Sequence, residues 1–305
     1  MSQKLNILVL GARGFIGETI CNAAQTAGHN VIRGVRTKQH DTDITVDYLR
    51  DNDAKTWLPR LQNIDAVVNA VGLLGGTEAD MMRVHGETPD AIAAACAQAG
   101  ITRFVQVSAL GVGGDLTTRY FRSKLAGEQA VRAALPSAHI VRPSLVFGKN
   151  GDSTKMFMQL TRLPALMLPQ SGGMMVQPVH VNDVAQAVVN LIGFDTAQNA
   201  AQNASPKTMT LAGTNALSMR DYLASLATQL GRRAPYVLPM PMFAAKLSAN
   251  LMQYLPQHVW TPETLMMLVA GSTANEAELA QFTAVLGRSI LPLENFVAAG
   301  ADHAN

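Results

Sequence analysis

Residues Leu5–Gly17 read Leu-Asn-Ile-Leu-Val-Leu-Gly-Ala-Arg-Gly-Phe-Ile-Gly, and this stretch decides the fold. The apolar run 5–10 predicts a buried strand, and the pattern from about Phe15 to Ala27 predicts a helix that ends at Gly28. Three glycines lie between them in G-x-x-G-x-x-G spacing. In this strand–turn–helix context the glycines indicate a phosphate-binding turn rather than a turn with packing glycines.

Each part of this turn has a physical role in holding a pyrophosphate. Gly11 permits the tight turn, Gly14 lets the backbone approach the phosphates, and Gly17 lets the helix pack against the sheet. The first helical residues, Phe15 and Ile16, offer free N–H groups at the positive end of the helix dipole. The stretch therefore predicts a dinucleotide-binding site.

The rest of the first half alternates short apolar runs with helical stretches, which favours a parallel sheet covered by helices. The predicted strands are 30–35, 44–46, 66–70, 103–107 and 138–141, and the predicted helices are 53–61, 90–98 and 120–134. We expect an α/β fold, a Rossmann doubly wound parallel sheet with a smaller C-terminal lobe. Residues 1–150 would form the nucleotide-binding domain, with strand contributions from about 175–195, and residues 151–305 mainly the lobe.

The second half is less regular. We expect a loop with a short helix over 151–173, a helix over Asp183–Ile192 capped by Asp183, a surface loop over 195–207, and helices over 218–230 and 241–254. Two methionine groups lie here: Met156, Met158, Met167, Met174 and Met175, and Met240, Met242, Met252, Met266 and Met267. Thioethers fill irregular apolar space, so we favour core or pocket lining over a membrane or partner surface.

Composition bounds the class of protein. The 305 residues are 48% hydrophobic with a formal charge of +2, which allows a large core and gives no sign of a nucleic-acid partner. Cys21 and Cys96 lie in apolar helical patterns, so we expect no disulfide framework and a reducing, cytoplasmic compartment. No secretory signal or apolar run of ~18 residues is visible, although peripheral association with the inner membrane is compatible with the sequence.

The end of the second predicted strand indicates which dinucleotide is bound. NAD-binding domains carry an acid here that holds the ribose 2′-hydroxyl, yet no Asp or Glu occurs from Asn30 through His40. Arg36 would pair with a 2′-phosphate through its planar donor fork, and Arg13 could contact the other side. Solvated arginines are the alternative. The missing acid favours NADP(H) as the cofactor.

Further segments resemble a known family. They are Asp47-Tyr48, Asn69-Ala70-Val71-Gly72, Val107-Ser108-Ala109-Leu110-Gly111, Tyr120-x-x-x-Lys124, Val141-Arg142-Pro143-Ser144 and Val179-His180-Val181-Asn182-Asp183-Val184. With the glycine turn, they resemble the extended and atypical short-chain dehydrogenase/reductases, which are epimerase/dehydratase-like. The resemblance is greatest to the branch of the NADPH-binding accessory subunit of respiratory complex I, and its specificity falls after about Asp183.

This resemblance implies roles for several residues. Asp47 would hydrogen-bond the adenine amino group, with Tyr48 beside the ring. The other implied contacts are Ala70, Val71 and Gly72 along the adenosine ribose and pyrophosphate, and Pro143 and Ser144 near the nicotinamide amide.

Tyr120 and Lys124 are the candidate catalytic pair and would also contact the cofactor. Their four-residue spacing places them on one helix face. A phenol titrates near ~10, but a nearby ammonium and the positive nicotinamide favour the phenolate. Lys124 can hold the nicotinamide ribose hydroxyls while Tyr120 exchanges a proton with a substrate oxygen. A surface helix pair is the alternative.

Ser108 is the third candidate catalytic residue. Active members of the resembled family place Ser or Thr second in a Ser-Ser or Ser-Thr pair, whereas the pair here is Ser108-Ala109. An offset of one residue would turn the hydroxyl to the other face, and a hydrogen bond to local backbone is an equal alternative to catalysis. Loss of an oxyanion donor can cost ~10²–10³ in rate, so turnover could be weak while cofactor binding persists.

Other chemistries find no pattern in the sequence. The seven histidines show no metal-ligand spacing, so we expect no metal, and His180 is better interpreted as a packing residue at a helix entry. There is no G-x-S-x-G elbow and no context for a cysteine nucleophile.

Two function classes stay open. One is an NADP(H)-dependent oxidoreductase acting on a carbonyl or secondary alcohol of a hydrophobic small molecule, which Tyr120 and Lys124 favour. The other is a non-catalytic NADPH-binding protein, structural or redox-sensing and linked to a respiratory or quinone-linked assembly, which Ala109 and the resemblance favour. The fold alone cannot decide between them.

Overall fold

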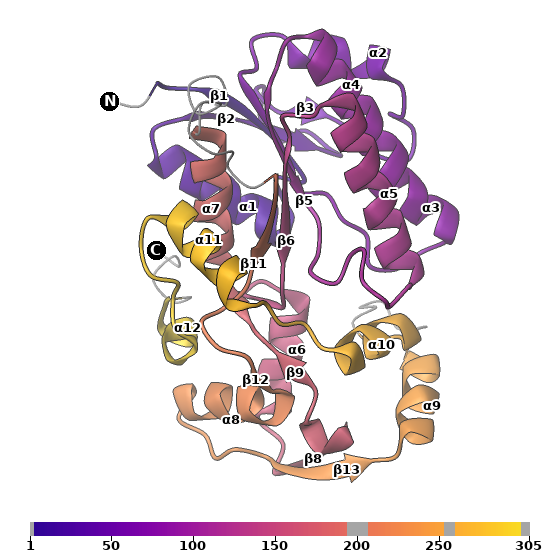
Figure 1. Ribbon diagram of the computed structural model, residues 1–305, viewed down its shortest axis with the longest axis vertical. Coiled ribbons are helices and arrows are strands. Elements are labelled where there is room, and N and C mark those ends of the chain that lie inside the picture. Colours follow the sequence, from indigo (N-terminus) through magenta and orange to yellow (C-terminus); the bar gives the residue numbers. More distant parts are fainter. Residues whose placement is uncertain (1–2, 194–206, 253–259, 300–305) are drawn as a thin grey trace. The chain divides into compact units, whose positions relative to one another are not determined.

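The computed structural model describes residues 3–193, 207–252 and 260–299 (Figure 1). The chain divides into two compact units. The first comprises Met1–Arg142, Asn182–Thr210 and Ala284–Gly287, and the second comprises Pro143–Val181, Leu211–Thr283 and Arg288–Asn305. The division therefore falls at Arg142 rather than near residue 150, and the first unit includes two later segments.

In the described residues, seven strands form one sheet in the order β11-β6-β5-β4-β1-β2-β3. They are β1 (Asn6–Leu10), β2 (Asn30–Val35), β3 (Ile44–Thr45), β4 (Ala66–Asn69), β5 (Arg103–Val107), β6 (His139–Pro143) and β11 (Thr208–Leu211). The pairings from β3 through β6 are all parallel. Their order, 3-2-1-4-5-6, is that of the doubly wound Rossmann sheet, in which ligands bind at the carboxyl ends of the strands where the order reverses. Here that point lies between β1 and β4.

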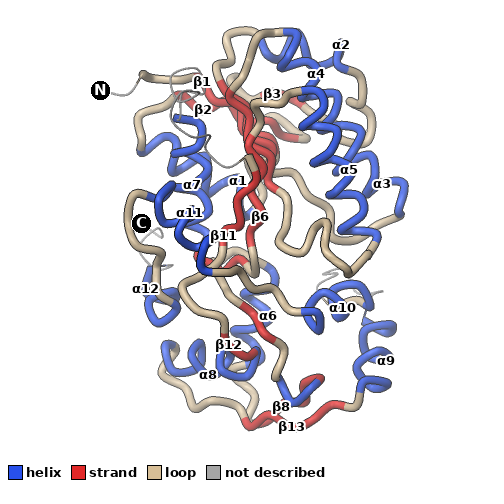
Figure 2. Tube along the Cα trace, viewed as in Figure 1, coloured by secondary structure: helices blue, strands red, loops and turns tan. Residues whose placement is uncertain are grey.

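Helices cover both faces of this sheet (Figure 2). On one face lie α1 (Phe15–Thr26) and α7 (Val181–Gly193), and on the other lie α2 (Ala54–Trp57), α4 (Thr88–Gln98) and α5 (Arg119–Ala134). A 3₁₀ turn, Leu58–Leu61, follows α2, and α3 (Glu78–Met82) continues into a π-helical turn, Arg83–Glu87, before α4.

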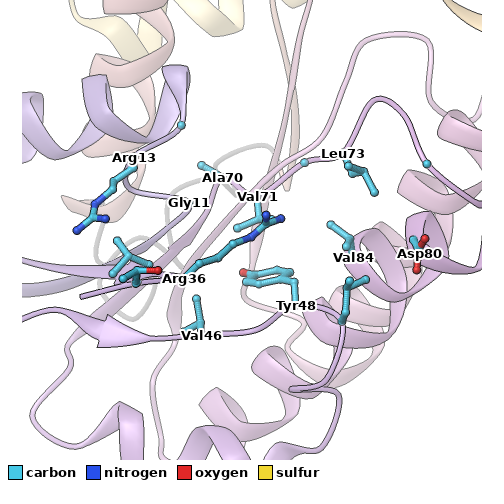
Figure 3. Close-up of a pocket in the computed structure, with 17 residues that line it drawn as sticks. Gly11, Arg13, Arg36, Val46, Tyr48, Ala70, Val71, Leu73, Asp80 and Val84 are labelled. Atoms are coloured by element: carbon cyan, nitrogen blue, oxygen red, sulfur yellow. The ribbon is translucent and has the colours of Figure 1, made fainter. Parts of the chain in front are cut away.

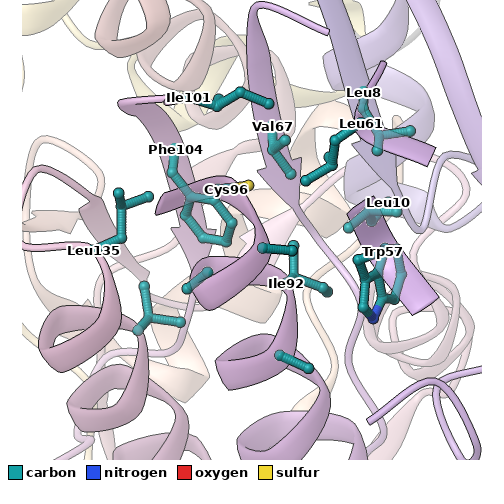
Figure 4. Packing of buried hydrophobic residues seen from close by; sticks show 14 of the residues in the cluster. Leu8, Leu10, Trp57, Leu61, Val67, Ile92, Cys96, Ile101, Phe104 and Leu135 are labelled. Atoms are coloured by element: carbon teal, nitrogen blue, oxygen red, sulfur yellow. The ribbon is translucent and has the colours of Figure 1, made fainter. Parts of the chain in front are cut away.

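A buried apolar cluster fixes α2, α4 and α5 to the sheet (Figure 4). Trp57, Ile92 and Phe104 are fully buried in it, together with Leu8 and Leu10 of β1. Each such side chain contributes about 1.5–3 kcal/mol by leaving water. This packing holds α5, which carries Tyr120 and Lys124, in a fixed register on the sheet.

The second unit is built from short elements. It contains β7 (Val146–Phe147) paired with β10 (Val179–His180), β9 (Met175–Val176) paired with β12 (Leu217–Ser218), and β8 (Ala165–Pro169) paired with β13 (Tyr236–Met240). Its helices are α6 (Asp152–Leu160), α8 (Met219–Gln229), α9 (Met242–Met252), α10 (Pro262–Ala270), most of α11 (Glu276–Leu286) and α12 (Phe296–Ala299), with 3₁₀ turns at Gln170–Gly172 and Leu293–Asn295.

Several expectations need correction. The helix expected from Asp183 begins at Val181, so Asp183 lies in its first turn and is not the cap. The later strand that joins the sheet is Thr208–Leu211 and not one from 175–195, since Thr-Met-Thr-Leu has only two apolar residues and no apolar run that would mark it. Residues 151–173 hold the expected short helix, Asp152–Leu160, but also a strand, Ala165–Pro169, where only loop was expected. Residues 195–206 of the expected surface loop lie outside the described residues.

Two further features concern the cysteines and the membrane. Cys21 and Cys96 are both buried and free, and burial raises the pKa of their thiols to about 11 and about 12. Among the helices of the described ranges, none is both long and apolar enough to cross a bilayer.

Candidate active site

A pocket of about 690 Å³ lies where the strand order reverses (Figure 3). Ligand sites usually have ~300–1,000 Å³, so a nucleotide fits the space. Of the residues expected to contact the cofactor, those that line it are Gly11, Arg13, Gly14, Arg36, Tyr48, Ala70, Val71 and Gly72. They come from the turn after β1, the end of β2, the loop after β3 and the loop after β4. The expected cofactor residues that are not part of this lining are Phe15, Ile16, Asp47, Tyr120, Lys124, Pro143 and Ser144.

The glycine turn is sterically closed on its inner side and open toward the pocket. Gly11 has φ +78°, a conformation that favours glycine. A Cβ on Gly17 would lie 2.1 Å from the carbonyl oxygen of Gly11, so α1 can approach the turn only with glycine here. Gly14 donates its N–H to the same oxygen at 2.8 Å and is itself exposed. The turn thus has the close packing and the open backbone that a pyrophosphate requires.

Two arginines reach this pocket in different ways. Arg36 is exposed at its wall. Arg13 is not simply solvated, because its guanidinium pairs with the carboxylate of Asp43 at 3.2 Å. Asp43 is buried and also accepts the backbone N–H groups of Gln39 and His40. The Gln39 N–H is the first cause that lowers the pKa of Asp43, with lesser contributions that include Arg13.

The sequence does not mark Asp43, because it lies three residues beyond the stretch Asn30–His40 in which an NAD-binding domain carries its acid. Its carboxylate is occupied by backbone and by Arg13, and it does not line the pocket. An acid follows β2 after all, but it orders the loop after that strand and is not presented to a ribose.

Tyr48 supports the floor of the pocket through buried hydrogen bonds. Its hydroxyl donates to Asn69 Oδ1 at 2.7 Å, and Asn69 Nδ2 donates to Gln106 Oε1 at 2.9 Å. Asn69 Oδ1 also accepts the N–H of Val71 at 3.2 Å, which fixes the loop after β4. Burial raises the pKa of Tyr48 well above its ordinary value, so the phenol stays a donor. The neighbouring Asp47 is half-exposed and pairs with Arg50 at 3.5 Å, so its adenine contact stays a prediction.

Tyr120 and Lys124 lie on α5 and are not a surface pair. Lys124 is 4% exposed, and its Nζ lies 5.9 Å from the centre of the Tyr120 ring. That ammonium donates to the carbonyl oxygen of Val107, at the end of β5, at 3.2 Å. Burial lowers the pKa of Lys124 to about 8, partly offset by Glu128. Burial also raises the pKa of the half-buried Tyr120 to about 12, which is opposite to the direction expected from the neighbouring ammonium.

His85, in the π-helical turn, connects the pocket to this pair and was not anticipated. Its Nε2 accepts the N–H of Leu73 at 2.9 Å, so Nδ1 is assigned the hydrogen and donates to Ser123 Oγ at 2.8 Å. Ser123 Oγ in turn donates to the carbonyl oxygen of Tyr120 at 2.9 Å. Burial, and secondly the charge of Lys124, lower the pKa of His85 to about 2, so the ring is neutral.

The packing around His85 is close. Its ring meets that of Tyr120 edge-on at 5.4 Å between centres. A Cβ on Gly127 would lie 1.7 Å from the carbonyl oxygen of His85, so only glycine lets α5 lie this close to the π-helical turn. A lone histidine and a mid-helix glycine are weak signals in a sequence, and their connection appears only in three dimensions.

A second anchor of α5 is the ion pair between Glu128 and Arg142. The carboxylate of Glu128 is 3% exposed and accepts two hydrogen bonds from Arg142, at 2.6 and 2.9 Å. Bidentate pairs of this kind fix orientation as well as charge. In the sequence Arg142 is only one residue of a family segment, but in the structure it holds the helix that carries Tyr120.

The remaining candidate residues have distinct surroundings. Ser108 is buried, and its Oγ has no hydrogen-bond partner among the described residues, which speaks against the local-backbone alternative.

Pro143 and Ser144 belong to the second unit, where Ser144 Oγ donates to the carbonyl oxygen of Gln177 at 2.5 Å. His180 is buried between the rings of Phe147 and Phe296. Within the described ranges, no three His, Cys, Asp or Glu side chains gather as metal ligands would.

Comparison with known proteins identifies the family. Residues 7–203 match the family model described as NAD dependent epimerase/dehydratase family. The chain belongs to the NAD-dependent epimerase/dehydratase family. One relative is the Mus musculus protein named NADH dehydrogenase (ubiquinone) 1 alpha subcomplex subunit 9, mitochondrial. It is 28% identical over 265 residues, which cover 83% of this chain and 68% of the relative. Another, ceramide reductase of Caulobacter vibrioides, is 31% identical over 189 residues, covering 60% of this chain and 59% of the relative.

Solved structures share the fold of this epimerase/dehydratase family member. Human epimerase family protein SDR39U1 with NADPH has a TM-score of 0.71 at 20% identity, covering 98% of this chain and all of that chain. UDP-N-acetylglucosamine 4-epimerase from Bacillus cereus has a TM-score of 0.68 at 17% identity, covering 97% of this chain and 98% of that chain. The family and the Rossmann fold expected from the sequence are confirmed.

Proposed function

We propose that this family member binds NADP(H) in the pocket and acts as an oxidoreductase on a carbonyl or secondary alcohol of a hydrophobic substrate. The observation that carries the proposal is the buried Lys124 ammonium beside Tyr120. Burying an ammonium is unfavourable, and such groups concentrate where chemistry needs a shifted pKa. The relative named ceramide reductase agrees with a hydrophobic substrate.

The choice of NADP(H) rests on charge at the pocket wall. Arg36 is exposed there, Arg13 is held there by Asp43, and no acid follows β2 before Asp41. A 2′-phosphate carries charge that a guanidinium binds through charge-assisted hydrogen bonds. Solved structures of this fold hold NAD or NADPH, so the residues and not the fold support the choice.

The chemistry assigns a role to each catalytic candidate. The bound nicotinamide would supply or accept the hydride. Tyr120 would donate its proton to the substrate oxygen, since burial holds the phenol in its acid form. Lys124 would stabilise the phenolate left behind and bind the nicotinamide ribose. Ser108, whose hydroxyl is unpaired in the described structure, would donate to the same substrate oxygen.

Calorimetry tests the cofactor. NADPH should bind more tightly than NADH by roughly 1–3 kcal/mol. Arg36→Ala should remove most of this preference and leave NADH binding nearly unchanged. Arg132→Ala is the matched control, because Arg132 is exposed and does not line the pocket. Equal affinities of the wild type for both dinucleotides would refute the choice.

A panel of hydrophobic ketones, aldehydes and quinones with NADPH tests the reaction. Tyr120→Phe should lower the rate by ~10²–10⁴ while NADPH affinity changes little. Equal turnover by the wild type and the variant would exclude Tyr120 as the proton donor.

A non-catalytic NADPH-binding protein is the second candidate. Ala109 in place of the expected hydroxyl favours it, as does likeness to a relative named as a subunit of NADH dehydrogenase. In that case no member of the panel would oxidise NADPH, Tyr120→Phe would be silent, and NADPH would still raise the melting temperature by mass action.

A further inference from the structure

The second unit carries a concentrated apolar surface. Thirteen large apolar side chains are exposed in the described residues. Ten of them lie on α9, β13, β8 and α10, if Leu163, two residues before β8, is counted with that strand. We call these ten the apolar face: Leu163, Met167, Tyr236, Leu238, Met242, Phe243, Leu247, Leu251, Met252 and Met266. Soluble proteins expose single apolar residues routinely, but a gathered set marks an interaction surface.

The members of this face adjoin one another in the fold. β13 pairs with β8 in parallel, with Leu238 opposite Met167. α9 follows β13 after one residue and contacts both β8 and α10 (Figure 1). The two strands and the two helices are therefore neighbours within the second unit, and their exposed apolar side chains lie on adjoining elements.

Helix α9 turns its large apolar side chains outward, whereas a usual surface helix turns them toward the core. Its inward residues are the small Ala245 and Ala249, both 0% exposed. Its outward residues at four-residue spacing are Phe243, Leu247 and Leu251, which are 74%, 59% and 66% exposed. A helix that serves only its own core buries the large apolar side chains. This orientation reserves them for something outside the chain.

The charge around the face indicates what covers it. Arg162, Arg233 and Lys246 are exposed on or beside these elements. No Asp or Glu occurs from Tyr222 through Pro262, and Glu263 is the acid at the start of α10. Two copies of the chain would bring like charges together, which disfavours self-association through this face. An anionic surface with an apolar interior complements it.

We propose that the apolar face docks on an anionic lipid bilayer, with α9 lying in the plane of the interface. Amphipathic helices bind membranes by inserting apolar side chains below the headgroups while basic residues contact anionic lipid. Phe243, Leu247 and Leu251 insert in this arrangement, and Lys246 contacts the headgroups. The methionine groups are accordingly not wholly core, since Met167, Met242, Met252 and Met266 belong to this surface. The proposal does not depend on the chemistry of the nucleotide pocket.

Co-sedimentation of the full chain with vesicles tests the proposal. The wild type should bind vesicles that contain phosphatidylglycerol more strongly than vesicles of phosphatidylcholine alone, and added salt should weaken that binding. Phe243→Asp should reduce partitioning roughly tenfold or more, since an inserted aromatic side chain contributes at least that factor. Lys246→Glu should weaken binding to the anionic vesicles and leave binding to phosphatidylcholine unchanged.

Leu74→Asp is the matched control, because it adds the same charge at an exposed leucine of the first unit. It should bind the vesicles as the wild type does, and melting curves should show that all three variants fold. A wild type that stays in the supernatant with anionic vesicles overturns the proposal, as does equal loss in Phe243→Asp and Leu74→Asp. A dimer in light scattering that Phe243→Asp dissociates would assign the face to a second copy instead.

Discussion

Replacing Lys124 by methionine should stabilise the protein without cofactor while it impairs function. Burial lowers the pKa of this ammonium from 10.5 to about 8. At ~1.4 kcal/mol for each pH unit, that fall corresponds to ~3 kcal/mol of stability lost by keeping the charge buried at neutral pH. The variant also loses one hydrogen bond, to the Val107 carbonyl, worth ~1 kcal/mol. The net gain is about 2 kcal/mol, or roughly 4–8 °C in melting temperature.

The gain should depend on pH in a defined direction. Below pH 8 Lys124 is charged in both states, and the folded state carries the full cost. As the pH rises from about 8 to 10.5, the folded state loses this proton before the unfolded state does, so the stability of the wild type rises. The advantage of Lys124→Met should therefore shrink above pH 8 and disappear near pH 10.5.

Urea unfolding followed by circular dichroism, at pH values from 6 to 10.5, measures this. Lys155→Met is the control, because Lys155 is largely exposed and pairs with an exposed Asp152 at 3.6 Å; its effect should stay within ~0.5 kcal/mol. A Lys124→Met protein less stable than the wild type at pH 7, or a gain that persists unchanged to pH 10.5, would refute the reasoning. With NADPH present the order should reverse, since the variant loses a ribose contact.

Three further substitutions probe the framework of the site. Gly127→Ala places a Cβ 1.7 Å from a backbone oxygen of the π-helical turn and should cost ~3 kcal/mol or more in unfolding free energy, whereas Gly193→Ala, with nothing within 4 Å, should be neutral in the same urea titration. Tyr48→Phe removes a buried hydrogen bond to Asn69 and should cost ~1–2 kcal/mol; unchanged stability would show that this network is not needed. Asp43→Asn should make the free energy of unfolding depend less on pH in acid. The folded state lowers the pKa of this carboxyl below its ordinary value of 3.8, so its stabilising contribution is present above pH 3.8 and is lost as the pH falls through the folded pKa.

Local patterns predicted the parts of the fold that depend on neighbours in sequence. The glycine turn, the first six parallel strands and the helix that bears Tyr120 follow from apolar periodicity and turn chemistry, and the structure places them within a few residues. The strands of the second unit escaped prediction for two reasons. β7, β9, β10 and β12 have two residues each, and β8 and β13 contain proline, which is unfavourable inside a strand.

The site divides in the same way. The roles of Gly11 and Arg36 can be predicted from the sequence, because the residue type at each of these positions relative to a strand is part of a known binding pattern. His85 and Asp43 are not, because each acts through partners at a distance in the chain or outside a fixed motif. Burial of Lys124 could not be inferred either, since a Tyr-x-x-x-Lys pattern reads the same on an exposed helix.

The π-helical turn at Arg83–Glu87 also bears on how the chain can change in length. A π-helical turn holds about one residue more than an α-helical one, so it acts as a single-residue insertion within the continuous run from α3 to α4. Because the turn absorbs the extra residue, deleting one residue there would restore uniform α-helical winding and leave Met81 and Ile92 buried on either side. The side chains inside the turn would move instead, and His85, which bonds Leu73 and Ser123, is one of them. Relatives that lack the π-helical turn should therefore align through this run with a gap of one residue, and should not keep the hydrogen bonds of His85.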